Sequence, residues 1–527
     1  MTDSAETKRE IERKYEAGAG TAVPDLTKVR GVAAVRDEGV TELDAVYYDT
    51  PDLRLAAGSL TLRRRTGGKD AGWHLKFPVA TGIRDEIRAP LSESLPRSLA
   101  GLLRSRVRGR AVVPVVRLRS SRDVRHLTAE NGTLLAELSV DTVHAEHLPT
   151  GAEASWTEIE VELADDADEA VLDAVGKRLE KAGIHPSDAP SKLARALEET
   201  GARPAGGGED GGNEDGGGED GTRRAARQAT CGEGTAGHAV LAYVREQIDA
   251  LVALDPAVRR DLPDAVHQMR VASRRLRSAF KTYRKVLDRD VTDPLGEELK
   301  WLGGELGQAR DLQVLDARLR ASLDALPDEL VVGPVRERLR TWSTGEGGAS
   351  RSRILDALDS ARHLALLDRL DALLADPPLL PGAGRKAKKA LPKAVLRDYR
   401  RLADRVERAL DMEPGHDRDL ALHEARKAAK RARYAGEAAV PTLGKPAKRF
   451  AKRMKAVQSC LGDHQDSVVA RAALLDLAAR AHAAGESAFT WGVLHGREEA
   501  LAARREQELP ALWKRASAPE IRAALSH

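Results

Sequence analysis

The sequence predicts an α+β N-terminal domain, an eight-stranded antiparallel β tunnel or barrel with flanking helices, and an all-α C-terminal domain of two duplicated helical bundles. Three observations lead to this prediction. Short runs of alternating polar and apolar residues dominate the N-terminal part, a glycine- and acid-rich tract follows, and helical periodicity with repeated signatures fills the remainder. With 527 residues, the chain also exceeds what one hydrophobic core usually organises.

Eight short runs in the N-terminal part alternate between polar and apolar residues, as strands with one buried face do. These runs cover residues 10–16, 43–49, 60–65, 72–78, 84–90, 112–120, 133–141 and 156–163. Turn-like segments such as DTPD and RTGGKDAG separate them, and helical patterns occur near 95–106, 168–183 and 189–200. This count of strands and helices fits a closed antiparallel barrel.

The tract RPAGGGEDGGNEDGGGEDGTRRAAR covers residues 203 to 227 and contains almost nothing that could form a core. Such a composition predicts a flexible linker. We therefore predict a tunnel domain at 1–202, a linker at 203–232 and a helical domain at 233–520. The internal repeat of the helical domain is predicted at about 233–375 and 385–520.

The helical half contains two signatures that each occur twice. HQMRVASRRLR at residue 267 aligns with HEARKAAKRAR at 423, and LGQARDLQV at 306 aligns with LGDHQDSVV at 461. The two pairs are offset by 156 and 155 residues, which indicates a duplication whose halves pack about a pseudo-twofold axis. We expect the helices to be broken at Pro263, Pro294, Pro377 to Pro381 and Pro441.

Composition excludes several classes of protein. No stretch approaches the roughly 20 apolar residues that span a bilayer, and the N-terminus lacks the pattern of a secretory signal, so we expect a cytoplasmic protein without membrane partners. Cys231 and Cys460 are too few for a disulfide framework or a thiolate metal site. The aromatic content of 3% disfavours nucleic acid as a partner, since single-stranded binders stack bases on aromatic rings.

The predicted strands carry rows of charged residues on one face, because alternate residues of a strand point the same way. The rows are Glu10, Glu12 and Lys14; Arg63 and Arg65; His74 and Lys76; Arg84, Glu86 and Arg88; Arg117 and Arg119; Glu137 and Asp141; and Glu158, Glu160 and Glu162. A solvated sheet face is one interpretation. A charged lumen is the other, and we favour it because a solvated face would also tolerate Ser, Thr and Gln.

A lumen with both signs of charge suits the chemistry of phosphate chains. Clustered carboxylates repel one another unless a cation neutralises them, and hard divalent ions such as Mg²⁺ or Mn²⁺ prefer oxygen ligands. Guanidinium and ammonium groups hold phosphate oxygens. Such a site favours phosphoryl transfer, in which catalysis depends mainly on positioning and charge neutralisation.

The E-x-E-x-K pattern of Glu10, Glu12 and Lys14, followed in order by YYDTPDLRL, LTLRRR, GWHLKFP, EIEVEL and SKLARAL, resembles CYTH domains, the triphosphate tunnel metalloenzymes. The resemblance covers about residues 6 to 200 and implies a tunnel that hydrolyses inorganic triphosphate or thiamine triphosphate, or in a minority cyclises ATP. It implies metal ligands at Glu10, Glu12, Asp141, Glu158 and Glu160. It implies substrate-binding residues at Lys14, Arg63, Arg65, Lys76, Arg117, Arg119 and Lys192. The expected catalytic set is Glu10, Glu12, Lys14 and Glu86.

The segment VHQMRVASRRLRSAFKTYRK, residues 266–285, has seven Lys or Arg residues and no acid. Its basic residues recur every three or four positions and so share a helix face, as do those of the second copy. A solvated, ion-paired helix face is the ordinary explanation, but it would need acids at the fourth position along. The alternative is a basic groove for a polyanion, which could be polyphosphate, nucleic acid or acidic protein.

The repeated patterns H-x-x-R-V-x-x-R-R-L-R with L-G-x-x-R-D, and H-x-x-R-K-x-x-K-R-x-R-Y with L-G-D-H-x-D, resemble the CHAD domain over about residues 233 to 510. The resemblance implies duplicated helical bundles that bind inorganic polyphosphate. The implied contacts are His267, Arg270, Arg274, Arg275, Arg277, Lys281, Arg310, His423, Arg426, Lys430 and Arg433. The second copy has Gln465 in place of Arg310, so we expect a less basic pocket there. We interpret Asp311 and Asp466 as buried partners of nearby arginines rather than as metal ligands.

Together, these patterns predict a Mg²⁺- or Mn²⁺-dependent hydrolase of inorganic triphosphate or short polyphosphate whose helical domain binds polyphosphate. The expected location is the cytoplasm, with association with polyphosphate granules. The alternatives are a non-catalytic polyphosphate-binding protein targeted to granules, an adenylate cyclase and a thiamine triphosphatase.

Overall fold

The computed structural model describes residues 6–18, 20–68, 70–202 and 231–526, without the side chains of 308–310 and 345–350. The chain divides into two compact units, Met1–Asn213 and Glu214–His527. The predicted linker, 203–232, lies almost entirely outside the described residues.

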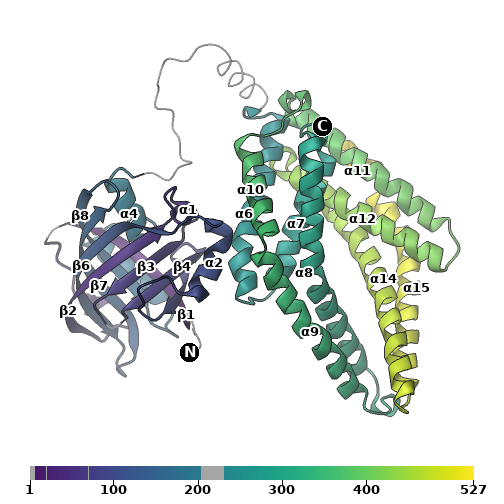
Figure 1. Ribbon diagram of the computed structural model, residues 1–527, viewed down its shortest axis with the longest axis horizontal. Coiled ribbons are helices and arrows are strands. Elements are labelled where there is room, and N and C mark those ends of the chain that lie inside the picture. Colours follow the sequence, from purple (N-terminus) through teal and green to yellow (C-terminus); the bar gives the residue numbers. More distant parts are fainter. Residues whose placement is uncertain (1–5, 19, 69, 203–230, 527) are drawn as a thin grey trace. The chain divides into compact units, whose positions relative to one another are not determined.

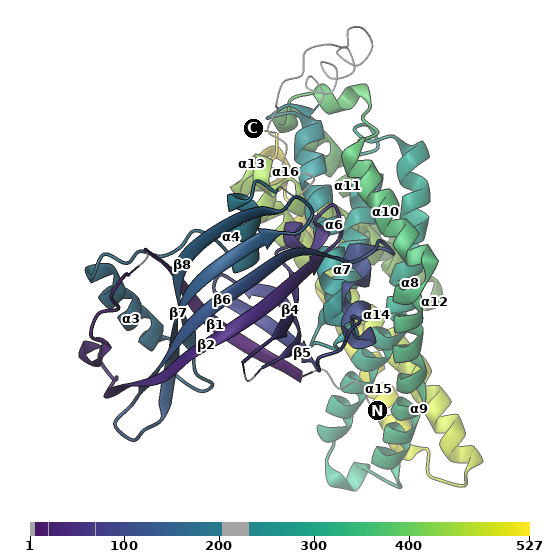
Figure 2. The same cartoon turned by 60° about the vertical axis from the view of Figure 1, so that its left-hand side comes forward.

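Eight antiparallel strands form a closed barrel in the first unit, as the alternating runs predicted (Figures 1 and 2). The strands are β1 (Glu6–Ala17), β2 (Ala34–Asp49), β3 (Thr61–Thr66), β4 (Gly72–Ala80), β5 (Ile83–Ala89), β6 (Val113–Thr128), β7 (Leu134–His147) and β8 (Ala152–Leu163). Their order around the barrel is β1-β5-β4-β3-β2-β6-β7-β8. The first half of β1 pairs with β5 and its second half with β8, which closes the ring.

Where helices cover the barrel, its outer face is apolar and its inner face is largely charged. Two helices cover the apolar surface: α2 (Arg97–Val107) packs on Leu62, Leu75 and Ile87, and α3 (Ala170–Lys181) packs on Ile159 and Val161. With the exception of Arg117 and Arg119, the predicted charged rows therefore face a lumen rather than forming the solvated face of an open sheet.

A third helix, α4 (Lys192–Glu199), carries a lumen residue at its first position. Ser191 caps the helix by accepting a hydrogen bond from the Ala194 N–H, which fixes where the helix begins. Leu193 and Leu197 pack against a cluster that includes Val116 of β6. The short helices α1 (Arg54–Ala57) and η1 (Leu26–Lys28) complete the unit.

The described part of the second unit is helical (Figures 1 and 2). Its helices are α6 (Ala236–Arg259), α7 (Ala265–Thr282), α8 (Arg289–Asp324), η2 (Asp328–Leu330), α9 (Val335–Asp359), α10 (Ala361–Ala375), η3 (Pro381–Gly384), α11 (Ala387–Leu410), α12 (His416–Ala438), α13 (Val440–Leu443), α14 (Lys445–Ala483), α15 (Phe489–Ala516) and α16 (Pro519–Ala523). None of the helices described in either unit has the length and apolar character needed to cross a bilayer.

The two halves of the helical unit pack in the same order. Helices α6, α7, α8 and α9 each contact the next, and so do α11, α12, α14 and α15. The basic helices α7 and α12 contact each other where the halves meet. The expected break at Pro294 is wrong, because this proline lies inside α8 as its sixth residue.

Candidate functional site

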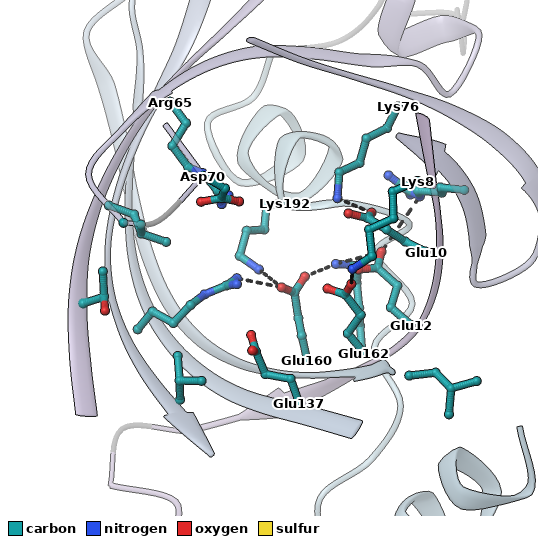
Figure 3. A pocket seen from close by; sticks show the side chains of 18 of the residues that line it. Lys8, Glu10, Glu12, Arg65, Asp70, Lys76, Glu137, Glu160, Glu162 and Lys192 are labelled. Carbon is teal, nitrogen blue, oxygen red and sulfur yellow. Dashed lines mark hydrogen bonds and ion pairs between the residues drawn. The ribbon is translucent and has the colours of Figure 1, made fainter. Parts of the chain in front are cut away.

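The barrel encloses a cavity of about 450 Å³. Its charged lining side chains come from all eight strands, from the segments that follow β3 and β8, and from the start of α4. Figure 3 shows side chains of both signs pointing into the lumen, with Lys192 and Glu160 directed toward each other. The charged lining residues are Lys8, Glu10, Glu12, Lys14, Glu38, Arg63, Arg65, Asp70, Lys76, Arg84, Arg88, Arg122, His126, Glu137, Glu160, Glu162, Asp165 and Lys192.

Three carboxylates gather at the wall of the lumen, where Glu160 lines the cavity and Asp141 and Glu158 lie buried beside it. Asp141 of β7 lies opposite Glu158 of β8 in the sheet register, and Glu160 follows two positions along β8. One oxygen from each carboxylate lies within 4.8 Å of the others. The Trp156 indole donates a 2.6 Å hydrogen bond to Glu158, which fixes that side chain. A buried, all-oxygen donor set of this kind fits a hard divalent cation.

The Lys192 ammonium group compensates the negative charge of this carboxylate triad. Its Nζ lies 2.9 Å from Asp141, 2.6 Å from Glu158 and 2.7 Å from Glu160. Arg122 of β6 donates two 2.7 Å hydrogen bonds to Asp141 and one of 2.9 Å to Glu160. The triad is therefore buried, and Lys192 and Arg122 compensate its negative charge.

The electrostatics of Glu160 follow from these contacts. Burial by itself would raise the pKa of its carboxyl group, but Lys14, Lys192 and Arg122 outweigh burial and hold the pKa well below its usual value. Glu160 consequently carries its negative charge at neutral pH.

The E-x-E-x-K residues of β1 face the same cavity. Glu10 pairs with Lys76 at 2.5 Å, and Glu12 lies 3.4 Å from Lys14 Nζ, which also bonds Glu160. Burial raises the pKa of the Glu10 carboxyl group, and Lys76 opposes this shift only in part. Glu10 and Glu12 thus share the lumen with the triad without belonging to its 4.8 Å cluster.

Glu86 is fully buried and organises the basic wall opposite the triad. It accepts a hydrogen bond from Arg88, lies 2.9 Å from His74 Nδ1, and lies 3.6 Å from both Arg63 and Lys76. Glu86 therefore does not line the cavity, but it holds in position basic side chains that do.

Arg117 and Arg119 were predicted to bind substrate in the lumen, and the structure places them outside it. Even-numbered residues of β6, including Arg122, face inward, and no bulge separates 117 from 122, so the odd-numbered arginines point outward. Arg117 pairs with Asp44 at 2.5 Å, and Arg119 is exposed.

Several lumen residues were not predicted as ligands. Lys8, Tyr47, Arg84, Arg88 and Arg122 all line the cavity. Lys8 shares the parity of Glu10 and Glu12, and Arg84 and Arg88 share that of Glu86, so strand alternation already held the signal for these three.

In the helical unit, Arg270 and Arg274 of α7 meet Arg426 and Lys430 of α12. The positions match across the repeat. Each arginine also has the same kind of partner, because Arg270 pairs with Asp311 at 2.9 Å and Arg426 with Asp466 at 3.5 Å. The two aspartates are arginine partners as interpreted, although Asp311, with a 74% exposed side chain, is not buried.

A glycine of α8 or α14 lets each of these arginines lie against the helix. A Cβ added at Gly307 would lie 3.3 Å from Arg270, and one added at Gly462 would lie 3.6 Å from Arg426. The absence of a side chain therefore matters for packing at Gly307, whereas a Cβ at Gly462 would make only an ordinary contact with Arg426.

Desolvation and like charges act together on this basic cluster of Arg270, Arg274, Arg426 and Lys430. Burial, together with the charges of Arg426, Arg274 and Arg270, lowers the pKa of Lys430 to about 7, although Asp466 acts in the opposite direction. Burial also lowers the pKa of Arg274. A polyanion would relieve this repulsion.

The remaining predicted contacts have varied surroundings. Arg275 and Arg433 share Glu437, at 3.0 and 2.6 Å, and His423 Nδ1 lies 2.6 Å from Gln465. His267 is half-buried, and the side chain of Arg310 lies outside the described part of the structure. Arg277 and Lys281 line a separate pocket.

Comparisons with known proteins agree with both halves of the fold. A model of the CYTH domain matches residues 8–197, and a model of the CHAD domain matches residues 242–475. An uncharacterised protein of Mycobacterium tuberculosis is 38% identical over 522 residues, which cover 96% of each chain. Thiamine-triphosphatase from Homo sapiens is 43% identical over 74 residues, 14% of this chain and 29% of that protein. The solved structure of PptA from Streptomyces chartreusis, 24% identical, superposes with a TM-score of 0.46 over 53% of this chain and 99% of its own.

Proposed function

The chain belongs to the family of proteins that join a CYTH domain to a CHAD domain, and on this premise we propose that its tunnel hydrolyses inorganic triphosphate or short polyphosphate with a divalent cation. The helical unit binds polyphosphate in this proposal. The local similarity to thiamine-triphosphatase supports triphosphate chemistry in general.

One observation carries the proposal: a carboxylate triad lies at the wall of a cavity that is also lined by cations, and Glu160 of the triad faces that cavity. Asp141, Glu158 and Glu160 offer oxygen ligands within 4.8 Å, and the same cavity of about 450 Å³ is lined by the cationic side chains Lys14, Arg63, Arg65, Lys76, Arg122 and Lys192. Phosphoryl transfer requires both kinds of group at close range.

Each set of residues has a distinct task in this proposal. Asp141, Glu158 and Glu160 would hold a divalent cation, with Glu10 and Glu12 in reach of the same lumen. When bound there, Mg²⁺ or Mn²⁺ neutralises phosphate oxygens and lowers the pKa of a coordinated water. The lysines and arginines of the opposite wall grip the phosphates and keep them in line, and Glu86 holds that wall in position.

The lining favours a bare phosphate chain over an organic triphosphate. Among the described residues around the cavity, only Tyr47 has a phenyl ring, and Leu43, Val124, Leu134 and Leu163 are the larger apolar ones. A purine or thiazolium group would need more stacking surface than this. Thiamine triphosphate and ATP are therefore the weaker candidates.

The basic cluster of the helical unit suits polyphosphate for a related reason. Its cations are desolvated and lie close to like charges, so a dense polyanion gains most by binding there. Joining this binder to the tunnel in one chain would raise the local concentration of substrate. We place the protein in the cytoplasm, with association with polyphosphate granules, as part of the same proposal.

The test is phosphate release from triphosphate, long-chain polyphosphate, ATP and thiamine triphosphate, each with Mg²⁺ and with Mn²⁺. Glu160→Gln should reduce the rate by about 100-fold or more, since it removes a charge from the triad. Glu153→Gln is the matched control on the same strand, because Glu153 is exposed on the outer face.

Two results would contradict the proposed activity. Cyclic AMP formation faster than phosphate release from triphosphate would make the tunnel a cyclase. Polyphosphate binding with no hydrolysis of any of the four substrates would favour the non-catalytic, granule-targeted alternative.

A further inference from the structure

A second basic pocket lies in the helical unit, among α7, α8, α11 and α12. Its volume is about 570 Å³. Its basic lining residues are Arg277, Lys281, Arg284, Arg289, Arg401 and Arg431. The only acidic residues among the described lining are Asp293 and Glu297, so positive charge prevails.

The acidic side chains nearby leave half of these cations uncompensated. Arg289 pairs with Asp293 at 2.5 Å, and Arg431 and Arg401 share Asp398, which lies behind the pocket, at 2.9 and 3.9 Å. Glu297 pairs with Lys300, outside the lining set, at 3.2 Å.

The other three basic residues, Arg277, Lys281 and Arg284, have no carboxylate within 4.0 Å among the described residues. The Nε of Arg277 is buried without a hydrogen-bond partner there. Burial lowers the pKa of both Arg277 and Lys281, but only Arg277 is half-buried, whereas Lys281 and Arg284 are exposed. The desolvated Arg277 guanidinium group, which has no carboxylate within 4.0 Å among the described residues, costs free energy that an anionic ligand would recover.

The second repeat differs from the first at the positions that make this pocket basic. At an offset of 156 residues, Arg277 corresponds to Arg433, Lys281 to Glu437 and Arg284 to Val440. Glu437 pairs with Arg433 at 2.6 Å and with Arg275 at 3.0 Å. The second repeat thus neutralises the row that the first repeat leaves open.

We propose that this pocket is a second anion site, present on the first repeat only, that binds condensed phosphate. The inference rests on the proposed polyphosphate binding of the helical unit. Arg270, Arg274, Arg277 and Lys281 recur at spacings of three and four residues along α7, and Arg284 follows in the turn after it, so one helix face leads from the basic cluster to the pocket. From Arg270 to Lys281 that face extends over about 16 Å at 1.5 Å per residue.

The chemistry of the pocket selects a dense, compact anion. Phe280 is the only aromatic residue among its described lining residues, and it belongs to the hydrophobic core, so a nucleic acid would find no ring on which to stack a base. Guanidinium groups from four helices instead match phosphate oxygens presented at several angles. The ligand is either a long chain that continues from the basic cluster or a separate short condensed phosphate.

The decisive variant gives the first repeat the residues of the second: Lys281→Glu with Arg284→Val, in the full chain. Lys514→Glu with Arg515→Val makes the same charge change at exposed positions of α15 and serves as the control. Affinity for long polyphosphate should fall by about tenfold or more relative to the control, since at least one charged hydrogen bond is lost. Lys281→Gln should give a smaller loss, and near-native circular dichroism would establish that each variant is folded.

Hydrogen exchange of the full chain locates the bound phosphate, because peptides of the helices are resolved from those of the tunnel. Long polyphosphate should protect peptides covering 277–297 in the wild type and not in Lys281→Glu/Arg284→Val. Protection of these peptides by triphosphate as well would identify a separate short ligand, whereas protection by long chains alone would identify a continuing chain.

The outcomes separate this inference from the proposed function. Equal polyphosphate affinity of the double variant and its control would overturn the second site while leaving polyphosphate binding intact. Absence of protection in every helical peptide of the wild type would instead refute the proposed binding function. Stronger protection of 277–297 by a DNA oligonucleotide than by polyphosphate would overturn the ligand class.

Discussion

Replacing Lys192 with Met should make the stability of the tunnel depend on a divalent cation. In the wild type, the Lys192 ammonium group lies within 2.9 Å of all three carboxylates of the triad and is only 10% exposed. The substitution keeps the side-chain length but removes the charge. Asp141, Glu158 and Glu160 then repel one another with less compensation.

The size of the effect follows from the remaining partners. Removing one partner of a buried ion pair costs roughly 3–5 kcal/mol. Arg122 still contacts Asp141 and Glu160, and Lys14 still contacts Glu160, so we expect the lower end of this range. For a domain of this size, about 3 kcal/mol corresponds to a fall in melting temperature of roughly 6–12 °C.

The measurement is calorimetry of the full chain in chelator and in excess Mg²⁺. The transition of the tunnel should fall in chelator and recover in Mg²⁺, because a bound cation would replace the missing charge. Lys177→Met, at an exposed position of α3, is the control and should leave both transitions in place. If the tunnel transition has the same melting temperature in Lys192→Met and in Lys177→Met, both in chelator, Lys192 does not stabilise the triad. That result would refute the electrostatic reasoning about the lumen.

Three further predictions concern single side chains. Arg122→Gln should lower triphosphatase activity by roughly 10- to 150-fold, which corresponds to the loss of one charged hydrogen bond. Arg119→Gln, on the outer face of the same strand, should change the activity little. Equal losses in the two variants would contradict the assignment of inward and outward residues. Trp156→Phe removes the hydrogen bond to Glu158 and should weaken Mg²⁺ affinity by about 10- to 100-fold in titration calorimetry. An unchanged Mg²⁺ affinity would show that the triad does not bind the metal. Because the pKa of Lys430 is lowered to about 7, this side chain loses its charge as pH rises through that value, so polyphosphate affinity should fall between about pH 6 and pH 8. In binding titrations, Lys430→Arg should flatten this pH dependence, since arginine keeps its charge over that range. An equally steep pH profile for Lys430→Arg would exclude Lys430 as the cause.

The barrel was predictable because the sequence alternates wherever the outer face of a strand is covered. Runs such as 72–78 and 156–163 have apolar residues under α2 or α3 and charged residues inside, so both their existence and their parity could be recognised. The same alternation correctly predicted that Glu10, Glu12 and Lys14 share one lumen with Glu160.

Alternation failed where a strand has no apolar covering. The structure extends β6 to Thr128 and starts β2 at Ala34, whereas the alternating runs covered only 112–120 and 43–49. The missed part of β6 contains SRDVRH, which is polar on both faces and therefore has no period-two signal. Arg122 lies in that part and was therefore missed. The alternating RLR pattern led to Arg117 and Arg119 being predicted as substrate-binding residues instead.

The contacts of the cations also distinguish the two units. In the tunnel, Lys14, Lys76 and Lys192 each lie within 3 Å of a carboxylate, so an entering phosphate chain must exchange those ion pairs for its own. In the proposed function, the released carboxylates would then be available to a divalent cation, which would couple phosphate binding to metal binding. In the helical unit, Arg277 and Lys281 have no such pair to exchange, so a phosphate chain gains their charge directly. A paired lumen therefore suits turnover with a metal, and an unpaired pocket suits retention of the chain.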